Sequence, residues 1–575
     1  MTRYLVTSAL PYANGPIHLG HVIGAYLPAD VYVRALRLRG EDVVFVSGSD
    51  EYGAAITIGA QRARESCAEY VAHWRDSIKS TFDALGIEFD IWSGTSVCPE
   101  HAGNAQEFFR RLDANGYLEQ RHSEQWYSEE ESMFLADRYV VGTCYVCGAA
   151  DARGDECPSC GTWLEAVKLG DARSALSDRP LVLRETTHWY LDLPKLRDEH
   201  IGEWFRDHEW KANVRAFVTE LLENLPARAI TRDLDWGIPV PAELAGDEVG
   251  KVLYVWFDAP IGYVSFTQQW ARERGTPEAW RDYWQGEDTR LVHFLGKDNI
   301  PFHCLVFPSM LYGVKQNFVL PWAAPAMEFY NLQGGKFSTS EQRTIPLEPF
   351  FERFDRDATR FYLLASAPET ADSEFRFQEF QSIVNAGLAD KIGNLTTRVL
   401  RFVAKHEDGV IPPITPEHTA DLDELLFTGC GEIVDPIDSL LAHRFRRAAE
   451  ELLANATVAN VFVDRTAPWA LRKTDPERMR GVLRTACEWL AWMARWMSPF
   501  MPDKAAELWT MLGLEGAPEA ARWPQRPERG AWRQLGDDRH LGEIRGLFDK
   551  LDDATIAEET AKYARPANGE LPGQG

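Results

Sequence analysis

The fold of this chain is decided near its N-terminus by the stretch YLVTSALPYANGPIHLGH, residues 4–21. Its first part, Tyr4 to Leu10, is a short apolar run that predicts a buried strand, and the Pro, Asn and Gly residues after it predict a turn. Helical periodicity then runs from Ile23 to Leu38, and Asp42 to Val46 is a second apolar run. Together they predict a β-α-β unit, which implies a parallel sheet whose ligand crevice lies at the carboxyl ends of the strands.

Two histidines stand where the predicted helix begins. His18 and His21 are three residues apart, so both rings share one face of the first turn. A helix N-terminus presents backbone N–H groups that attract phosphate, and Gly20 lets a flat base approach closely. The spacing alone leaves three interpretations open, namely phosphate binding, a metal pair and a structural role.

The composition is that of a large acidic globular protein. The 575 residues include 61 Lys+Arg and 87 Asp+Glu, a net charge of −26, and 45% of them are hydrophobic. This excludes a disordered chain and leaves room for roughly three to four domains. No apolar run approaches the roughly 20 residues that span a bilayer, and no signal-peptide core precedes Pro11, so we expect a cytoplasmic protein without membrane contact. The acidic total does not exclude a nucleic-acid partner, because phosphate contact depends on a local basic stripe.

Four of the nine cysteines form two C-x2-C pairs, Cys144, Cys147, Cys157 and Cys160. Such thiolates offer soft tetrahedral ligands for zinc, and an all-cysteine site leaves no open position for catalysis. The pattern therefore predicts a structural zinc site, with uncoordinated or redox-active thiols as the alternative.

Changes in composition and hydrophobic periodicity divide the rest of the chain into segments. Short polar and aromatic-rich pieces from about Asn115 to Ile230 indicate an inserted domain. After it, Lys251 to Phe257 and Leu291 to Leu295 predict buried strands, with a helix-like segment from Phe302 to Leu311. Beyond Asp357, long amphipathic segments predict a helical bundle. They are Ala358 to Ala365, Phe380 to Val403, Glu424 to Leu453 and Arg478 to Met497. The polar stretch from Tyr563 to Gly575 predicts a disordered tail.

Three motifs in order carry a family resemblance. They are ALPYANGPIHLGH (residues 9–21), YVWFDAPIGY (254–263) and GKDNIPFH (296–303). The chain resembles the class I aminoacyl-tRNA synthetases, most closely those for methionine, from about residue 4 to about residue 500. The resemblance implies an α/β Rossmann-type catalytic domain with a zinc-knuckle insertion, followed by an α-helical anticodon-binding bundle. The expected boundaries are 1–115 and 231–325 for the catalytic halves, 116–230 for the insertion, 326–385 for the signature loop and stem-contact region, 386–545 for the bundle, and 546–575 for a C-terminal helix and tail.

The resemblance also implies an activity. It is the ATP-dependent attachment of L-methionine to tRNA(Met) through a methionyl-adenylate intermediate, with Mg²⁺ accompanying ATP and one structural Zn²⁺ per chain. A paralogue that forms the adenylate for a non-tRNA acceptor, or that charges tRNA slowly, is the alternative. Relatives for larger aliphatic amino acids carry a long editing insertion that this chain has no room for. No strand-rich domain follows the bundle, so we expect a monomer.

The second motif suits a methionine side chain on physical grounds as well. Flat aromatic walls with small residues between them can hold an unbranched apolar chain and its thioether. By the resemblance, Asp50 accepts the substrate ammonium and Arg232 lies near the amino-acid site. The full methionine-binding set is Leu10, Tyr12, Asp50, Trp256, Ala259, Pro260, Tyr263 and His303.

The resemblance assigns the nucleotide end as well. The catalytic set is His18, His21, Asp50, Lys297 and Lys336, and the ATP-binding set is His18, Gly20, His21, Lys297, Asp298, Lys336, Ser338, Thr339 and Ser340. The last residues belong to GGKFSTS (334–340), in which Thr339 replaces a lysine that the family's signature loop normally carries. Losing one such charge contact can cost roughly 3 kcal/mol of transition-state stabilisation. Lys336, Lys297 and Mg²⁺, or the nearby Arg343, are candidates to compensate, and a slow paralogue is the third possibility.

The local basic stripe lies in the predicted bundle. Asn394, Arg398, Arg401 and Lys405 share one helical face because they are spaced by four, three and four residues. Basic side chains hold phosphates, and an aromatic ring such as that of Trp469 can stack on an unpaired base. By the resemblance, Asn394, Arg398 and Trp469 read the anticodon of tRNA(Met).

Overall fold

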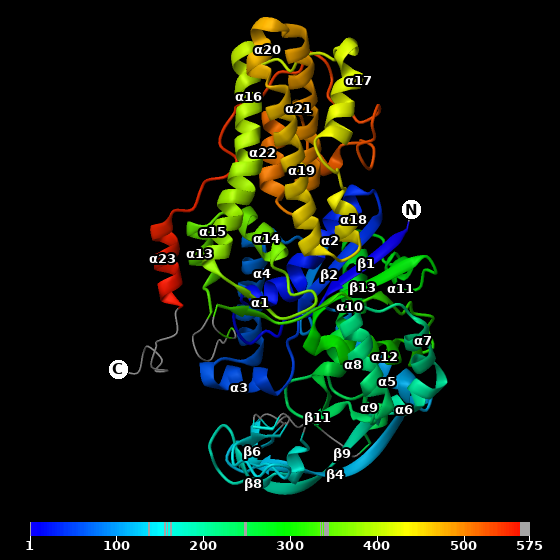
Figure 1. The fold of residues 1–575 in the computed structure, drawn as a ribbon. Helices are drawn as coiled ribbons and strands as arrows, with labels where there is room; N and C mark the ends of the chain where they lie inside the picture. The colour runs from blue at the N-terminus through cyan, green and yellow to red at the C-terminus, as the bar shows by residue number, and fades with distance from the viewer. Residues whose placement is uncertain are drawn as a thin grey trace.

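A computed structural model describes residues 2–135, 139–154, 157, 159–160, 164–246, 250–333, 335, 337 and 344–563. At the centre of the molecule is a parallel sheet (Figure 1) in the spatial order β14, β13, β1, β2, β3, with β15 also beside β13. The strands are β1 (Arg3–Ser8), β2 (Asp42–Ser49), β3 (Ile91–Gly94), β13 (Thr289–Gly296), β14 (Pro321–Ala323) and β15 (Ala326–Met327). The β-α-β unit and the parallel sheet predicted from the sequence are confirmed.

Alternate residues of the central strands face two different apolar cores. In β1, Val6 belongs to one core and Leu5 to the other, and in β2 the same is true of Phe45 and Val44. Helix α2 (Leu27–Leu38) packs in the first core, while α5 (His101–Ala114), α10 (Val255–Glu273) and α12 (Phe307–Gly313) pack in the second. The first core continues into the helical bundle, so sheet and bundle share one apolar interior.

Further helices and helical turns complete the part of the chain built around the central sheet. They are α1 (Leu19–His21), α3 (Ala54–Ala63), α4 (Cys67–Ala84), α9 (Ala242–Ala245) and α11 (Trp280–Trp284), the 3₁₀ turn η5 (Lys297–Asn299), and the π-helical turns η1 (Val22–Tyr26) and η6 (Phe302–Val306). One strand prediction was too long. Strand β12 ends at Leu253, and α10 begins at Val255, because the apolar residues from Val255 onward are buried on all sides of a helix.

The inserted domain is built on a long hairpin. Strands β4 (Leu118–Ser128) and β9 (Val182–Leu191) pair antiparallel, flanked by β5 (Met133–Phe134) and β10 (Arg228–Ala229). A small sheet with its own core lies at the far end of the hairpin, at the bottom of Figure 1. It consists of β6 (Val140–Thr143), β7 (Ala152–Arg153) and β8 (Gly170–Ser174), and the 3₁₀ turn η3 (Ala166–Lys168) directly precedes β8 in the chain.

The chain returns from the insertion through helices. These are α6 (Leu193–Leu196), η4 (Arg197–Ile201), α7 (Gly202–Asp207) and α8 (Ala212–Glu223). The antiparallel pair β11 (Thr231–Asp233) and β12 (Lys251–Leu253) then leads into α10. After β15, the parallel pair β16 (Tyr330–Leu332) and β17 (Ser373–Phe375) encloses α13 (Leu347–Arg353) and α14 (Arg356–Ala365) in sequence.

A helical bundle forms the other end of the molecule, at the top of Figure 1. Its elements are α15 (Phe377–Ser382), η7 (Ile383–Gly393), α16 (Asn394–His406), α17 (Pro416–Glu424), η8 (Leu425–Gly429), α18 (Pro436–Leu441), α19 (Phe445–Thr466), α20 (Pro468–Thr474), α21 (Pro476–Met497), α22 (Pro502–Met511) and η9 (Pro518–Ala520). The prediction of one long segment from Glu424 to Leu453 was wrong, because Pro436 and the left-handed His443 (φ 57°) interrupt it.

The C-terminal part returns to the base of the bundle. Helix α23 (Asp553–Lys562) lies against α15, and Arg353 of α13 binds Glu558 and Glu559. The predicted disordered tail lies, apart from Tyr563, outside the described residues. Every described helix is too short or too polar to cross a bilayer.

Candidate functional site

The two motif histidines lie at the carboxyl end of β1. His18 caps α1, and its Nδ1 accepts the backbone N–H of His21 at 3.4 Å, while Nδ1 of His21 accepts the backbone N–H of His18 at 3.1 Å. Each neutral ring therefore carries its proton on Nε2, the nitrogen that points away from the backbone. Burial, and the neighbouring ring after it, lower the pKa of His18 to about 3. His18 thus offers a neutral N–H donor to a phosphate oxygen rather than a positive charge.

Gly20 sits in the turn between these two rings. A Cβ placed on it would lie 2.9 Å from Cε1 of His18 and 2.9 Å from the backbone oxygen of Tyr330. Real Cβ atoms do not approach so closely, so a larger residue would displace His18 or β16. The glycine is therefore required by packing.

The signature loop meets His18 through an aromatic ring. Phe337 stacks on His18 with 4.7 Å between centroids, and His18 stacks on His21 at 3.8 Å. The predicted ATP contacts Lys336, Ser338, Thr339 and Ser340, and the candidate Arg343, lie outside the described residues. The described part of the loop thus docks on the first turn of α1.

Lys297 and Asp298 follow the carboxyl end of β13, at the same sheet edge. Nζ of Lys297 lies 2.8 Å from Oε2 of Glu328 and 2.9 Å from Oδ1 of Asp372. Partial burial lowers the pKa of Lys297, but the bonds to these two carboxylates outweigh it and the net shift is upward. The ammonium is charged, and these two carboxylates occupy two of its three N–H groups.

Asp50 follows the last residue of β2. Its backbone bonds with Pro11 and Ala13 extend the sheet by one parallel bridge to Tyr12. The side chain is 7% exposed, and among the described residues its Oδ1 has no hydrogen-bond partner. Burial, and after it the charge of Asp258, raise the pKa of Asp50 well above its usual value. A buried carboxyl group with an unsatisfied oxygen is suited to receive a cation such as an ammonium.

Glu51 fixes the backbone next to Asp50, and the sequence analysis did not find it. Its carboxylate is fully buried and accepts bonds from Ser49 Oγ (2.6 Å), Arg75 (2.9 Å) and the backbone of Ser96 (3.1 Å). A Cβ on Gly94 of β3 would lie 2.2 Å from Oε1 of Glu51, so only glycine leaves room for this carboxylate. The sequence did offer one signal for Glu51, because it is an acidic residue that directly follows Asp50 at the end of a predicted strand.

The residues predicted to line the side-chain pocket come from α10, from η6 and from the segments that follow β1 and β2. Tyr263 of α10 and His303 of η6 bond at 2.8 Å, and Nδ1 of His303 is 3.1 Å from the carbonyl oxygen of Asn299. Since a carbonyl can only accept, His303 donates through Nδ1 and accepts the Tyr263 hydroxyl proton through Nε2. Burial lowers the pKa of His303 to about 4, so this tautomer persists at neutral pH.

The other residues predicted to line the pocket have the following neighbours. The ring of Trp256 stacks on Phe302 at 4.0 Å between centroids. Leu10 reaches α10, since its Cδ1 lies 3.4 Å from a Cβ built on Gly262, and the hydroxyl of Tyr12 donates to the backbone of Tyr52 at 2.5 Å. Ala259 and Pro260 are buried in the first turns of α10. Nearby, the guanidinium of Arg232 lies 3.8 Å from the ring centre of Tyr254.

The four cysteines come together in the small sheet of the insertion. Their sulfur atoms all lie within 4.8 Å of one another, and Cys147 Sγ is 3.6 Å from Cys157 Sγ. Four sulfurs bound to one zinc ion are about 3.8 Å apart, so the cluster has suitable dimensions for it. The backbone N–H groups of Val146 and Cys147 point at Cys144 Sγ at 3.4 and 3.5 Å, and the latter bond contributes most to the lowered pKa of Cys144. The cysteines fit a structural zinc ion.

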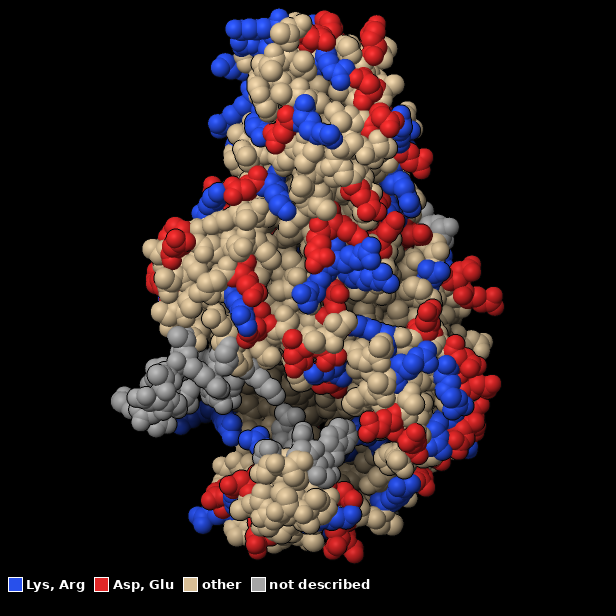
Figure 2. All heavy atoms as spheres, in the orientation of Figure 1, with Lys and Arg blue, Asp and Glu red and all other residues tan. Residues whose placement is uncertain are grey.

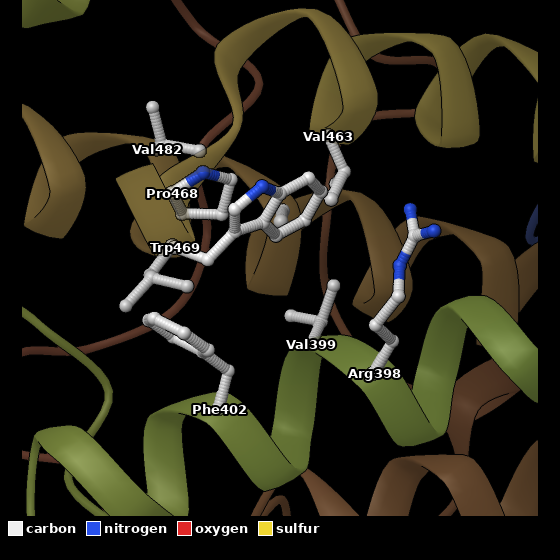
Figure 3. A pocket seen from close by; sticks show the side chains of 9 residues that line it. Arg398, Val399, Phe402, Val463, Pro468, Trp469 and Val482 are labelled. Atoms are coloured by element: carbon white, nitrogen blue, oxygen red, sulfur yellow. The ribbon is translucent and has the colours of Figure 1, made fainter. Parts of the chain in front are cut away.

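A second candidate site lies at the tip of the bundle. Figure 3 shows the indole of Trp469 beside Val399, Phe402 and Val463, with the guanidinium of Arg398 at its edge. Trp469 is 47% exposed, and its ring centre is 5.6 Å from Cζ of Arg398. Arg398 also binds Asp464 at 2.9 Å. An exposed indole next to an apolar pocket and a cation can stack on an unpaired base.

The predicted basic face surrounds this pocket. Asn394, Arg401 and Lys405 are exposed on α16, and Arg472 and Lys473 are exposed on α20. Figure 2 shows Lys and Arg side chains gathered along the edge of the bundle where these two helices lie. A locally basic surface thus exists on a chain of strongly negative net charge, as phosphate contact requires.

Comparison with known proteins gives matches over nearly the whole chain. Residues 4–400 match the family model of the class I tRNA synthetases (M), and residues 420–568 match that of the anticodon binding domain of methionyl tRNA ligase. The methionine–tRNA ligase of Rubrobacter xylanophilus is 42% identical, with 99% of this chain and 98% of that protein covered. The methionine–tRNA ligase of Protochlamydia amoebophila is 44% identical, with 97% of this chain and 79% of that protein covered. Among solved structures, the Mycobacterium tuberculosis methionyl-tRNA synthetase in complex with methionyl-adenylate superposes with a TM-score of 0.75 at 25% identity. The match covers 95% of this chain and 100% of that chain.

Proposed function

The chain belongs to the methionyl-tRNA synthetases of class I, and from that premise we propose how its residues carry out the reaction. It attaches L-methionine to tRNA(Met) through methionyl adenylate. The observation that supports the assignment of the site best is the shared sheet edge. Asp50 at the end of β2 and His18 after β1 lie at the carboxyl ends of adjacent parallel strands. An amino acid and a nucleotide phosphate can therefore be held next to each other in one crevice.

We propose that methionine binds with its ammonium at Asp50 and its thioether chain between Trp256 and the Tyr263–His303 pair. Leu10, Tyr12, Ala259 and Pro260 complete the walls. Because Tyr263 donates its proton to His303, its oxygen presents lone pairs rather than a donor to the rest of the pocket. This binding mode orients the carboxylate toward the histidine turn, where the nucleotide phosphates lie.

Activation needs no side-chain nucleophile. A carboxylate oxygen of methionine attacks the α-phosphorus of ATP, the new O–P bond forms, and the bond to pyrophosphate breaks. Nε2–H groups of His18 and His21 donate to phosphate oxygens as negative charge moves to pyrophosphate. Lys297, Asp298 and the loop residues Lys336, Ser338, Thr339 and Ser340 are proposed to hold the nucleotide, with Mg²⁺ accompanying ATP.

The second step uses the bundle to choose the tRNA. A terminal ribose hydroxyl attacks the activated carbonyl carbon, the ester forms and AMP leaves. We propose that Asn394, Arg398 and Trp469 contact the anticodon, since an exposed indole, an amide and a guanidinium provide stacking and base-edge bonding. One structural Zn²⁺ on Cys144, Cys147, Cys157 and Cys160 fixes the tip of the insertion.

We also propose the domain boundaries named above, a monomeric state and a cytoplasmic location. Sedimentation of the purified chain tests the monomeric state.

The function itself is tested by ATP–pyrophosphate exchange with His21→Asn. We expect at least about a hundredfold loss of methionine-dependent exchange with an unchanged melting temperature, because one phosphate donor at the transition state is removed. Unchanged exchange would contradict the role of the histidine turn.

A further inference from the structure

Asp258 is a second buried carboxyl group next to the amino-acid site, and the mechanism above does not use it. It lies in the first turn of α10 beside the pocket residue Ala259 and is 1% exposed. Within the part of the chain that the structure describes, Oδ1 of Asp258, like Oδ1 of Asp50, has no hydrogen-bond partner. Buried oxygens of this kind are costly, so two of them close together point to a cationic ligand.

The two carboxyl groups are close enough to interact. The charge of Asp258 is, after burial, the largest cause of the raised pKa of Asp50, and it also acts on Tyr12 and Tyr52. The start of α10 explains this proximity, because Val255 lies 3.5 Å from a Cβ built on Gly53, in the loop that follows Asp50. The first turn of α10, which carries Asp258, is therefore packed against the loop that follows Asp50.

His101 of α5 holds the other oxygen of Asp258. Its Nε2 is 3.3 Å from Oδ2 of Asp258, and its Nδ1 is 3.1 Å from Oγ of Ser265. That hydroxyl donates its one proton to the carbonyl oxygen of Ile261 (3.2 Å) and accepts from Asn104 (3.0 Å). Nδ1 of His101 must therefore be the donor to Ser265, which leaves Nε2 as the acceptor in a neutral ring.

One proton consequently lies between Asp258 and His101. Burial raises the pKa of Asp258 and lowers that of His101 to about 3, so the empty site holds the proton on Oδ2. Transfer to Nε2 breaks the O–H bond, forms an N–H bond and exchanges no proton with solvent. The only further charge that acts on His101 among its described neighbours is Glu51, which is paired with Arg75. The pair stays neutral overall, but the transfer places a carboxylate near Asp50.

We propose that Asp258 is a second acidic group of the ammonium subsite and that His101, by taking its proton, charges it when the ammonium of methionine binds. The inference rests on the proposed role of Asp50 as the carboxylate that receives this ammonium. Asp258 acts as a positioning residue, because its field in the water-poor interior strengthens the pairing of the ammonium with Asp50. In the empty site Asp258 is protonated, so two buried carboxylates do not lie next to each other. In the occupied site both Asp50 and Asp258 are ionised.

The test compares two ligands that differ only in the ammonium group. L-Methionine and 4-(methylsulfanyl)butanoate share the thioether chain and the carboxylate, and their dissociation constants are measured by calorimetry on the full-length chain. Asp258→Asn keeps the shape and can still donate to His101. We expect this variant to raise the dissociation constant of L-methionine about tenfold and to change that of the butanoate by less than about twofold. An equal loss for both ligands, or no loss for methionine, would overturn the proposal.

Two further variants keep the outcomes distinguishable. Asp50→Asn should show the same ammonium-selective loss, and larger; if it does not, the proposed role of Asp50 has failed. If Asp50→Asn behaves as expected while Asp258→Asn binds methionine like the wild type, only the present inference fails. His101→Phe keeps an aromatic ring but removes the nitrogen base, so the binding of L-methionine, and not that of the butanoate, should again be weakened. Wild-type methionine binding by this variant at an unchanged melting temperature would overturn the role of His101.

Discussion

The ring of Phe337 stacks on the imidazole of His18, with 4.7 Å between centroids and 13° between planes. His18 in turn stacks on His21 at 3.8 Å and 24°. The three rings form a column that joins the signature loop after β16 to the first turn of α1. Loop docking and the orientation of the phosphate-binding imidazoles are therefore coupled through one aromatic side chain.

Phe337→Ala should slow adenylate formation without weakening methionine binding. The loss of stacking removes about 1 kcal/mol or more of contact that orients His18, so we expect roughly a tenfold lower rate. Rapid-quench single-turnover measurements with saturating methionine and ATP give the rate directly. Phe337→Tyr keeps the ring and serves as the control. An unchanged rate in the alanine variant would show that the column has no catalytic role.

Gly94→Ala and Gly103→Ala form a matched pair. A Cβ at Gly94 meets Oε1 of Glu51 at 2.2 Å, whereas a Cβ at Gly103, within α5, meets nothing within 4 Å. Gly94→Ala should displace Glu51 and the adjoining Asp50, raising the KM for methionine about tenfold or more. Gly103→Ala should be neutral or stabilise the protein by up to about 1 kcal/mol. Methionine kinetics and thermal melting check both, and equal KM values would contradict the role of Glu51.

These examples show which parts of the site the sequence could reveal. The residues proposed for the histidine turn, for the ammonium site at Asp50 and for the α10 pocket lie in contiguous motifs, so local pattern and resemblance were sufficient to single them out. The partners of Glu51 come from α4 and from the turn after β3, and the carboxylates that bind Lys297 come from beyond β15. Such contacts depend on tertiary packing between distant segments and leave no local pattern. The same reason explains the shortened strand before Val255, because burial on all sides masks periodicity.

The cysteine cluster should contain one zinc ion per chain. Atomic absorption of the purified protein gives the stoichiometry, and Cys157→Ser should lower it because a buried thiolate ligand is lost. Cys430→Ser, outside the cluster, should leave it unchanged. The insertion tip of Cys157→Ser should also be cleaved faster by protease, since its small core includes Cys144 and Cys157. Metal-free protein with a protease-resistant tip would contradict the structural zinc assignment.

Trp469→Ala should reduce charging but not activation. Loss of one stacking platform costs about 1 to 3 kcal/mol, so kcat/KM for tRNA(Met) should fall roughly 10- to 100-fold. ATP–pyrophosphate exchange should remain at the wild-type rate, because Trp469 lies at the tip of the bundle, away from the sheet. Trp469→Phe should recover part of the loss. A parallel fall in exchange would indicate a folding defect and contradict the assignment.

His443 should make stability fall in mild acid. Its ring packs against Tyr32 and Phe294, and burial, with a smaller effect of Lys211, lowers its pKa to about 4. Between pH 6.5 and 4 the unfolded chain therefore binds a proton that the native state excludes, so stability decreases as the pH falls. His443→Asn tolerates the left-handed backbone and removes this dependence.

The comparison of the two proteins isolates that residue. On going from pH 7 to pH 4.5, the wild type should lose about 2 to 3 kcal/mol more free energy of unfolding than His443→Asn, as measured by urea titration. An equal loss in both proteins would show that His443 takes up its proton without unfolding.

The most direct test of the whole account is aminoacylation of purified initiator and elongator tRNA(Met) with labelled methionine, alongside ATP–pyrophosphate exchange. The account predicts methionine-dependent exchange together with charging of both tRNAs, and a roughly 10- to 100-fold fall in charging alone in Trp469→Ala. Exchange without charging of either tRNA would contradict it, because the crevice would then form methionyl adenylate for a different acceptor.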